Sequence, residues 1–133
     1  MRVTILILDK LKQSVIVIGR QKEGRIYQVW PGGGLESSET LEAAALREVA
    51  EELDINLSTQ QLTLLESSAE GAVFLAETDL AVGKLAISGE EKERSSRDNV
   101  YSPYWLSLDQ LASLDVFPKI HVRAIKSKIR ELK

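Results

Sequence analysis

The stretch "WPGGGLESSETLEAAALREVAEELDI", residues Trp30–Ile55, places three consecutive glycines ahead of a segment with helical character. Thr40 is a suitable N-cap, and Glu42 suits the positive end of a helix. The residues that follow are rich in alanine, leucine and glutamate, which all favour helix. The pattern therefore predicts a helix from about Leu41 to Leu53.

Three glutamates, Glu48, Glu51 and Glu52, project from one flank of this predicted helix. At about 100° per residue, Glu48 and Glu52 are about 40° apart, and Glu51 lies roughly a further 60° away. Like charges at this spacing cost only a few tenths of a kcal/mol, so a solvated acidic face is the simplest interpretation. The alternative is a cation site, because Mg²⁺ and similar ions prefer converging carboxylate oxygens. Arg47 lies within the cluster and can hold Glu39 by a bidentate pair.

The adjoining glycines favour the cation site. Glycine backbone can approach a phosphate closely, because no side chain intervenes. Cations held beside such a turn can bridge phosphate oxygens and activate a water molecule. The arrangement therefore suits metal-assisted attack on a phosphate.

Length and composition narrow the class of protein. A chain of 133 residues with 44% hydrophobic residues is expected to form a single domain over residues 1–133. A net charge of −3 argues against binding extended nucleic acid. The chain has no cysteine, which excludes disulfides and thiolate metal sites. The apolar run at Val3–Leu8 is too short for a signal sequence or a membrane span, so we expect a soluble, cytoplasmic protein.

Short runs of β-branched or alternating residues predict strands, and the first two of them are expected to pair as a buried hairpin. These runs are Val3–Leu8, Ser14–Gly19, Arg25–Trp30, Leu62–Ser68, Gly71–Leu80, Lys84–Ser88 and Tyr101–Leu108. A short helix capped by Ser107 and an amphipathic helix from about Pro118 are predicted near the C-terminus. Strands interleaved with helices indicate an α+β or α/β sandwich with mixed strand directions.

The spacing of the opening stretch resembles the signature of the Nudix hydrolases: glycine, five residues, glutamate, seven residues, then Arg-Glu-apolar-any-Glu-Glu-any-Gly-apolar. Eight of its nine defined positions match, and they are Gly33, Glu39, Arg47, Glu48, Val49, Glu51, Glu52 and Ile55. Asp54 replaces the last glycine, and we expect it to adopt the same left-handed turn at a cost of roughly 1 kcal/mol. The stretches "VWPGGGLE" and "YSPYWLSLDQL" also resemble the family. The resemblance implies the Nudix fold, an α+β protein of the α/β/α sandwich type with a mixed central sheet flanked by helices.

The resemblance also implies roles. Glu48, Glu51 and Glu52 would bind Mg²⁺ or Mn²⁺, with Glu52 the most essential and the carbonyl group of Gly32 a further ligand. Glu39 would orient Arg47 or hold an outer-shell water. The general base of the family lies either in the signature or on a later loop, which here offers Glu90, Glu91 and Glu93. We favour Glu91, although a solvated acidic loop explains these residues equally well.

Substrate contacts are predicted outside the helix. The turn of Gly32, Gly33 and Gly34 would approach the phosphates, and Arg20 could either reach a phosphate or remain a surface residue. Tyr27 and Trp30 could stack on a base, although aromatic residues in such strands commonly belong to the core. Tyr101 and Tyr104 could line the pocket. His121, the only histidine, is expected at the surface.

The resemblance implies hydrolysis of a nucleoside diphosphate linked to another group. Three marks of family subgroups are missing: the proline of ADP-ribose hydrolases, the tyrosine of dinucleoside polyphosphate hydrolases and the proline-tryptophan motif of NADH pyrophosphatases. A nucleoside triphosphate, intact or oxidised, is therefore the expected substrate, with monophosphate and pyrophosphate as products. The expected partner is a small nucleotide, not a membrane or extended nucleic acid, and a homodimer is possible. The alternatives are a nucleotide-sensing domain without activity and a hydrolase of RNA 5′ ends.

Overall fold

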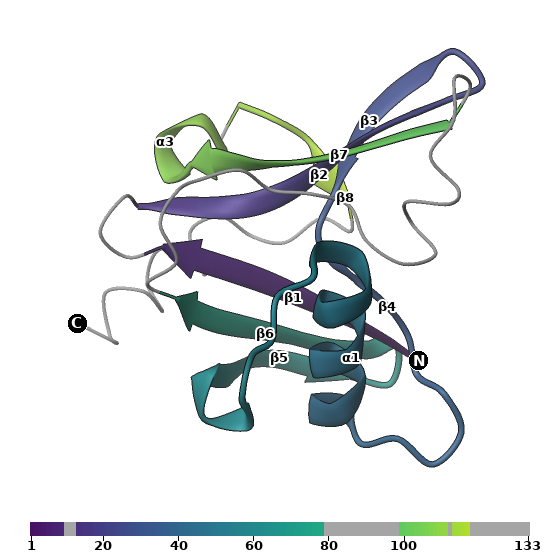
Figure 1. Cartoon of the computed structure of the whole chain (residues 1–133), viewed down its shortest axis with the longest axis vertical. Coiled ribbons are helices and arrows are strands. Elements are labelled where there is room, and N and C mark those ends of the chain that lie inside the picture. The colour runs from purple at the N-terminus through teal and green to yellow at the C-terminus, as the bar shows by residue number, and fades with distance from the viewer. Residues whose placement is uncertain (10–12, 79–98, 112, 118–133) are drawn as a thin grey trace.

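The structure is a computed structural model that describes residues 1–9, 13–78, 99–111 and 113–117. It contains one eight-stranded mixed sheet with a helix packed against it, as Figure 1 shows. The strands are β1 (Arg2–Asp9), β2 (Ser14–Lys22), β3 (Arg25–Val29), β4 (Gly32–Gly34), β5 (Leu62–Ser68), β6 (Gly71–Thr78), β7 (Asn99–Ser107) and β8 (Val116–Phe117). The helices are α1 (Leu41–Leu53), the 3-10 helix η1 (Thr59–Gln61) and α3 (Leu108–Leu111). The predicted α+β class with a mixed sheet is confirmed.

The strand order is β5-β6-β1-β2-β3-β8, while β4 pairs with β1 and β7 pairs with β2. The pairs β1–β6 and β3–β8 are parallel, and the other pairs are antiparallel. The predicted hairpin of the first two strands forms only beside its turn, at Leu8↔Val15 and Asp9↔Ser14. Beyond this point β1 runs along β6 and β2 runs along β7, so the sheet opens into two halves (Figure 1).

The division of the sheet follows from the apolar character of both strands. Val3, Ile5 and Ile7 of β1 belong to one core cluster, while Leu6 and Leu8 belong to another. Successive side chains of a strand point to opposite faces, so β1 must be covered on both sides. The first cluster lies under α1, which contributes Ala44, Ala45, Val49 and Leu53.

The helix α1 begins and ends where its capping residues predict. The N–H group of Ala43 donates a hydrogen bond of 3.1 Å to Oγ1 of Thr40. Asp54 adopts the left-handed conformation, with φ 56° and ψ 37°, and its N–H group donates to the carbonyl oxygen of Ala50. The prediction that Asp54 adopts the left-handed turn in place of glycine is therefore confirmed.

The short helix α3 is also capped as predicted, because Oγ of Ser107 accepts from the N–H group of Gln110 at 3.2 Å. The predicted strand at Lys84–Ser88 and the predicted helix from Pro118 lie outside the described residues. No helix in the described part of the chain is long and apolar enough to cross a membrane.

Candidate active site

The three glycines of β4 lie between β1 and the acidic flank of α1. A Cβ atom at Gly33 would overlap the carboxylate of Glu48, and a Cβ at Gly32 would overlap the carbonyl oxygen of Val3. The N–H group of Gly32 donates a 2.8 Å hydrogen bond to Oε1 of Glu52. Close packing therefore requires glycine at two of these positions: Gly33 lets the carboxylate of Glu48 rest on the backbone of β4, and Gly32 lets β4 lie against β1.

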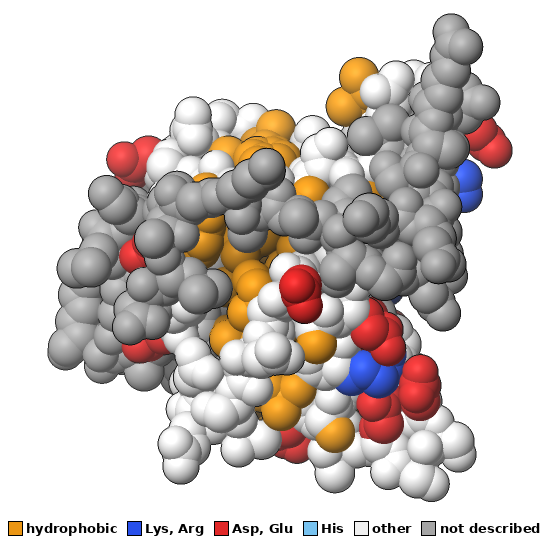
Figure 2. Space-filling model, viewed as in Figure 1, with side chains coloured by type: hydrophobic (Ala, Val, Ile, Leu, Met, Phe, Trp, Pro, Cys, Tyr) orange, Lys and Arg blue, Asp and Glu red, His pale blue; other side chains and the backbone are white. Residues whose placement is uncertain are grey.

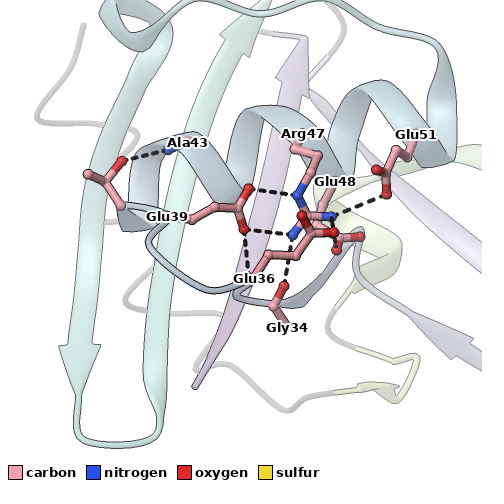
Figure 3. Close-up of polar contacts among 8 residues, drawn as sticks. Gly34, Glu36, Glu39, Ala43, Arg47, Glu48 and Glu51 are labelled. Atoms are coloured by element: carbon pink, nitrogen blue, oxygen red, sulfur yellow. Dashed lines mark hydrogen bonds and ion pairs between the residues drawn. The ribbon is translucent and has the colours of Figure 1, made fainter.

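Arg47 connects most of the polar groups of this region, as Figure 3 shows. Its Nε and Nη2 atoms donate to the two carboxylate oxygens of Glu39 at 2.7 and 2.9 Å, which confirms the predicted bidentate pair. Nη2 also donates to the carbonyl oxygen of Gly34 at 2.9 Å. Nη1 donates to Glu48 at 2.9 Å and to Glu51 at 3.2 Å. One guanidinium group thus ties the start of α1, its acidic flank and β4 together.

These contacts change the proton affinities of the groups involved. Hydrogen bonds from Arg47 and from the backbone of Glu36 lower the pKa of Glu39. The hydrogen bond to Glu39 raises the pKa of Arg47. Burial raises the pKa of Glu48 despite its contact with Arg47, and its side chain is only 14% exposed. Glu48 is therefore a carboxylate with little access to water, which a nearby cation would stabilise further.

Glu48, Glu51 and Glu52 line one pocket of about 390 Å³, which we call the acidic pocket. Figure 2 shows acidic side chains gathered around basic atoms over the part of α1 beside β4. Across the described ranges, however, no three acidic or histidine side chains converge closely enough to hold a metal ion.

The carboxylates of Glu48, Glu51 and Glu52 do not converge on one point because each of them is held by another group. Arg47 holds Glu48 and Glu51, and the backbone of Gly32 holds Glu52. The atoms that could bind a metal ion are carboxylate and carbonyl oxygens, and these suit a hard divalent cation such as Mg²⁺ or Mn²⁺. The residues present therefore fit such an ion by their chemistry, although their contacts in this structure are made with one another.

The opposite wall of the acidic pocket includes Arg20 of β2 and Tyr101 of β7, which lie side by side in the register of the two strands. The guanidinium carbon of Arg20 lies 4.2 Å from the centroid of the Tyr101 ring, and Nη2 donates to the Tyr101 hydroxyl. The structure therefore places both Arg20 and Tyr101 in the lining of the acidic pocket, while contact between Arg20 and a phosphate stays a prediction.

The other aromatic residues divide between the two faces of the sheet. Trp30 is only 2% exposed and packs in the second core cluster, and it also contributes to the lining of the acidic pocket. Tyr104 packs against the same cluster, because it lies on the opposite face of β7 from Tyr101. Burial raises the pKa of Tyr104. Tyr27 lies on β3 and lines a second pocket.

Arg2 also lines the acidic pocket, a position that was not predicted from the sequence. No local pattern marks this residue. It reaches the site because β1 pairs with β4, which places Arg2 opposite Gly34. The candidate bases Glu90, Glu91 and Glu93, together with His121, lie outside the described residues.

Comparison with known proteins concerns the domain and the fold of the chain. The family model of the NUDIX domain matches residues 1–127. No curated protein matches the chain. Many solved structures share its fold, and three of them illustrate the low sequence identity.

A MutT protein of Methanosarcina mazei is 18% identical, with a TM-score of 0.62 over 99% of this chain and 94% of that one. The dihydroneopterin triphosphate pyrophosphohydrolase of Escherichia coli is 18% identical, with a TM-score of 0.66 over 98% and 94%. A bifunctional NMN adenylyltransferase/ADP ribose pyrophosphatase of Francisella tularensis, complexed with AMP and a Mn ion, is 19% identical, with a TM-score of 0.59 over 98% and 41%.

Proposed function

The chain belongs to the Nudix family of hydrolases, and we propose that it hydrolyses a nucleoside triphosphate, intact or oxidised, to the monophosphate and pyrophosphate. One observation supports this most directly. The glycine strand β4 and the acidic flank of α1 form one wall of a pocket whose other wall carries Arg20. Oxygen ligands for cations and a side-chain cation thus face the same space, which suits a polyphosphate with several negative oxygens.

Nudix hydrolases generally depend on a divalent cation. We propose that Glu48, Glu51 and Glu52 hold Mg²⁺ or Mn²⁺ here, with the carbonyl oxygen of Gly32 as a further ligand. When bound, such an ion neutralises phosphate oxygens and lowers the pKa of water. Glu52 is the residue on which we expect activity to depend most, because its carboxylate reaches back to the glycine strand.

The remaining polar residues are assigned by what they contact. Arg47 positions the acidic flank, since it donates to Glu39, Glu48 and Glu51 at once. Arg20 binds a phosphate oxygen, because its guanidinium group is held beside the pocket by Tyr101. Gly33 and Gly34 let the phosphates approach the backbone.

Hydrolysis adds the oxygen of water to one phosphorus and breaks the bridging P–O bond, so a base must accept one proton from that water. Glu51 and Glu52 are candidates in the signature. Glu91 is the candidate outside the described residues.

The choice of a triphosphate is the finer part of the proposal. It is supported by the three missing subgroup marks and by one protein of the same fold, the dihydroneopterin triphosphate pyrophosphohydrolase of Escherichia coli. Another relative of this fold is named an ADP ribose pyrophosphatase, so the fold alone does not select a substrate. We place the protein in the cytoplasm, with a free nucleotide as its partner.

Measuring phosphate and pyrophosphate release tests the proposal. The panel holds nucleoside triphosphates, their 8-oxo forms, nucleotide sugars, ADP-ribose, dinucleoside polyphosphates and a 5′-triphosphate RNA, each with Mg²⁺ or Mn²⁺. We expect pyrophosphate from a triphosphate and a loss on the order of 100-fold or more in Glu52→Gln. Glu42→Gln is the matched control, because Glu42 is exposed in the first turn of the same helix.

Two other results would redirect the proposal. Nucleotide binding without any release would indicate the sensing domain, and release from the RNA alone would indicate an RNA 5′-end hydrolase.

Melting experiments test the cation site without relying on activity. A ligand at 100 times its dissociation constant stabilises a protein by about 2.7 kcal/mol, so millimolar Mn²⁺ should raise the melting temperature. The rise should be smaller in Glu48→Gln than in the unmodified protein. Unchanged melting with Mn²⁺, in both the free and the nucleotide-bound protein, would contradict the assignment of these glutamates.

A further inference from the structure

The sheet face that forms one wall of the acidic pocket continues outward along the β2–β3 hairpin. Side chains two residues apart on a strand share a face, and directly paired residues of neighbouring strands lie side by side. Three such pairs follow one another from the core toward the turn, and they are Ile18↔Val29, Arg20↔Tyr27 and Lys22↔Arg25. The face therefore changes from apolar to cationic as it leaves the core. In Figure 1 this hairpin extends beyond the helix α1.

A second pocket of about 460 Å³, which we call the hairpin pocket, lies on this outer part of the face. It is lined by Lys22, Glu23, Arg25, Tyr27, Val29 and Phe117. Val29 lines the acidic pocket as well, so the two pockets adjoin. Phe117 reaches the pocket because β8 pairs with β3 in parallel, opposite Val29. It is 44% exposed, so part of its ring is accessible to a ligand.

The hairpin pocket combines flat apolar surface with hydrogen-bond donors. Tyr27 and Phe117 supply aromatic rings, on which nucleobases commonly stack. Among the residues that the structure describes, neither Lys22 nor Arg25 forms an ion pair with a carboxylate. The guanidinium carbon of Arg25 instead lies 6.0 Å from the centroid of the Tyr27 ring. A site that binds only phosphate would need the cationic side chains but not the two aromatic rings, so the rings point to a ligand with an aromatic group.

Arg20 joins the two pockets. It lines the acidic pocket, and its guanidinium carbon lies 5.6 Å from the centroid of the Tyr27 ring. A ligand that places its phosphates in the acidic pocket therefore passes Arg20 before it reaches Tyr27. In a nucleoside triphosphate, the group at that end is the base.

We propose that the hairpin pocket binds the nucleobase of the substrate, stacked on Tyr27, while the phosphates lie in the acidic pocket. Lys22 and Arg25 only donate hydrogen bonds, so they favour a base with keto and ring-nitrogen acceptors, as guanine presents at O6 and N7. Glu23 only accepts when ionised, which suits the N–H groups of the same base. This inference rests on the proposed nucleotide substrate.

Calorimetric binding with Mg²⁺ tests the assignment. The probes are GTP and ATP analogues with methylene-bridged phosphates, and inorganic tripolyphosphate, which has no base. Stacking on an aromatic side chain is worth about 1–3 kcal/mol, so Tyr27→Ala should weaken binding of the GTP analogue by about 5- to 150-fold. Tripolyphosphate should bind Tyr27→Ala as it binds the unmodified protein. Tyr27→Phe should bind the GTP analogue almost normally, and Arg25→Gln should reduce the preference for GTP over ATP.

Ile26→Ala is the matched control, because Ile26 is the next residue of β3, is 75% exposed and points to the opposite face. Melting of each variant checks its fold, and Phe117→Ala provides a second variant that should also weaken only the nucleotide. Equal weakening of the nucleotide and tripolyphosphate would overturn the inference. Unchanged nucleotide binding in both Tyr27→Ala and Phe117→Ala, or no binding of either nucleotide analogue, would also overturn it.

The failure of this inference and the failure of the proposed function give different results. If the GTP analogue binds in a manner that depends on Tyr27 but no nucleotide is hydrolysed, the base site stands and the hydrolase activity is refuted. If GTP is hydrolysed and its KM is the same in Tyr27→Ala, the activity stands and the base site is refuted.

Discussion

Replacing Gly33 by alanine should separate the integrity of the fold from that of the acidic site. A Cβ atom at Gly33 would lie 2.6 Å from Oε2 of Glu48 and closer still to the other carboxylate atoms. The carboxylate is the end of a flexible side chain, so it can move away and leave the backbone in place. The 2.9 Å hydrogen bond that Glu48 accepts from Arg47 would then be lost.

The expected cost of this movement is small. A hydrogen bond between charged groups contributes about 1.5–3 kcal/mol, but the displaced carboxylate regains water in return. Burial raises the pKa of Glu48, so the carboxylate is poorly hydrated where it now lies, and rehydration offsets part of the loss. We expect a net loss of about 1 kcal/mol in the free energy of unfolding, or about 3–5 °C in melting temperature.

Gly32→Ala is the variant with which the loss of stability in Gly33→Ala is compared. Its Cβ would overlap the backbone carbonyl of Val3 and lie 3.1 Å from Cα of Thr4, and neither atom can move without disturbing β1. Loss of the β1–β4 pairing, together with an unfavourable φ of 154°, should cost about 3 kcal/mol or more. The melting temperature should then fall by about 10 °C or more.

Melting curves and calorimetric titration with Mn²⁺ measure both effects. Gly33→Ala should melt close to the unmodified protein yet bind Mn²⁺ at least about tenfold more weakly, because one carboxylate ligand is displaced. The reasoning is refuted if Gly33→Ala binds Mn²⁺ normally, or if its melting temperature falls as far as that of Gly32→Ala.

Three further predictions concern α1 and its ends. Thr40→Ala removes the acceptor for the N–H group of Ala43 and should lower the free energy of unfolding by about 0.5–2 kcal/mol in urea titrations, whereas Thr40→Ser should change it little. Asp54→Gly removes the strain of the left-handed conformation from the folded state, but it also increases the conformational entropy of the unfolded chain. The free energy of unfolding should therefore rise by at most about 1 kcal/mol. A clear fall would show that the Asp54 side chain contributes to the turn. The pKa of Glu39 is lowered from 4.5, so the stability that its pair with Arg47 contributes is present above pH 4.5 and is lost as the pH falls through the folded pKa. The difference in stability between the unmodified protein and Glu39→Gln should therefore be largest near neutral pH and close in acid, and a difference that stays constant down to pH 3 would contradict the pairing.

The helix α1 shows how much local sequence can decide. Its first residue follows from Thr40 and its last from Asp54, because each cap is completed by a group three or four residues away. The pairing of Glu39 with Arg47 was predictable for a related reason, since Glu39 lies just ahead of the helix that carries Arg47 and their charges are complementary. The candidate cation ligands follow from the resemblance to the family signature, since their spacing alone is as well explained by a solvated acidic face.

The strands show where local sequence fails. The runs at β1 and β2 predicted a hairpin, yet each strand pairs along its length with a distant partner, β6 or β7. Local alternation does not show that Trp30 packs in one core cluster while Tyr101 packs in the other, where it meets Arg20. The face on which an aromatic residue lies depends on how its strand is placed in the sheet.

The sequence by itself therefore determined the helix, its caps and the chemical identity of the acidic flank, because these depend on hydrogen bonds and charges between near neighbours. The tertiary structure decided which groups face that flank. Arg20 and Tyr101 are 81 residues apart and meet through the pairing of β2 with β7, while Arg2 reaches the site through the pairing of β1 with β4. Such contacts arise from burying both faces of the central strands at once, and that requirement is met by the whole chain rather than by any one segment.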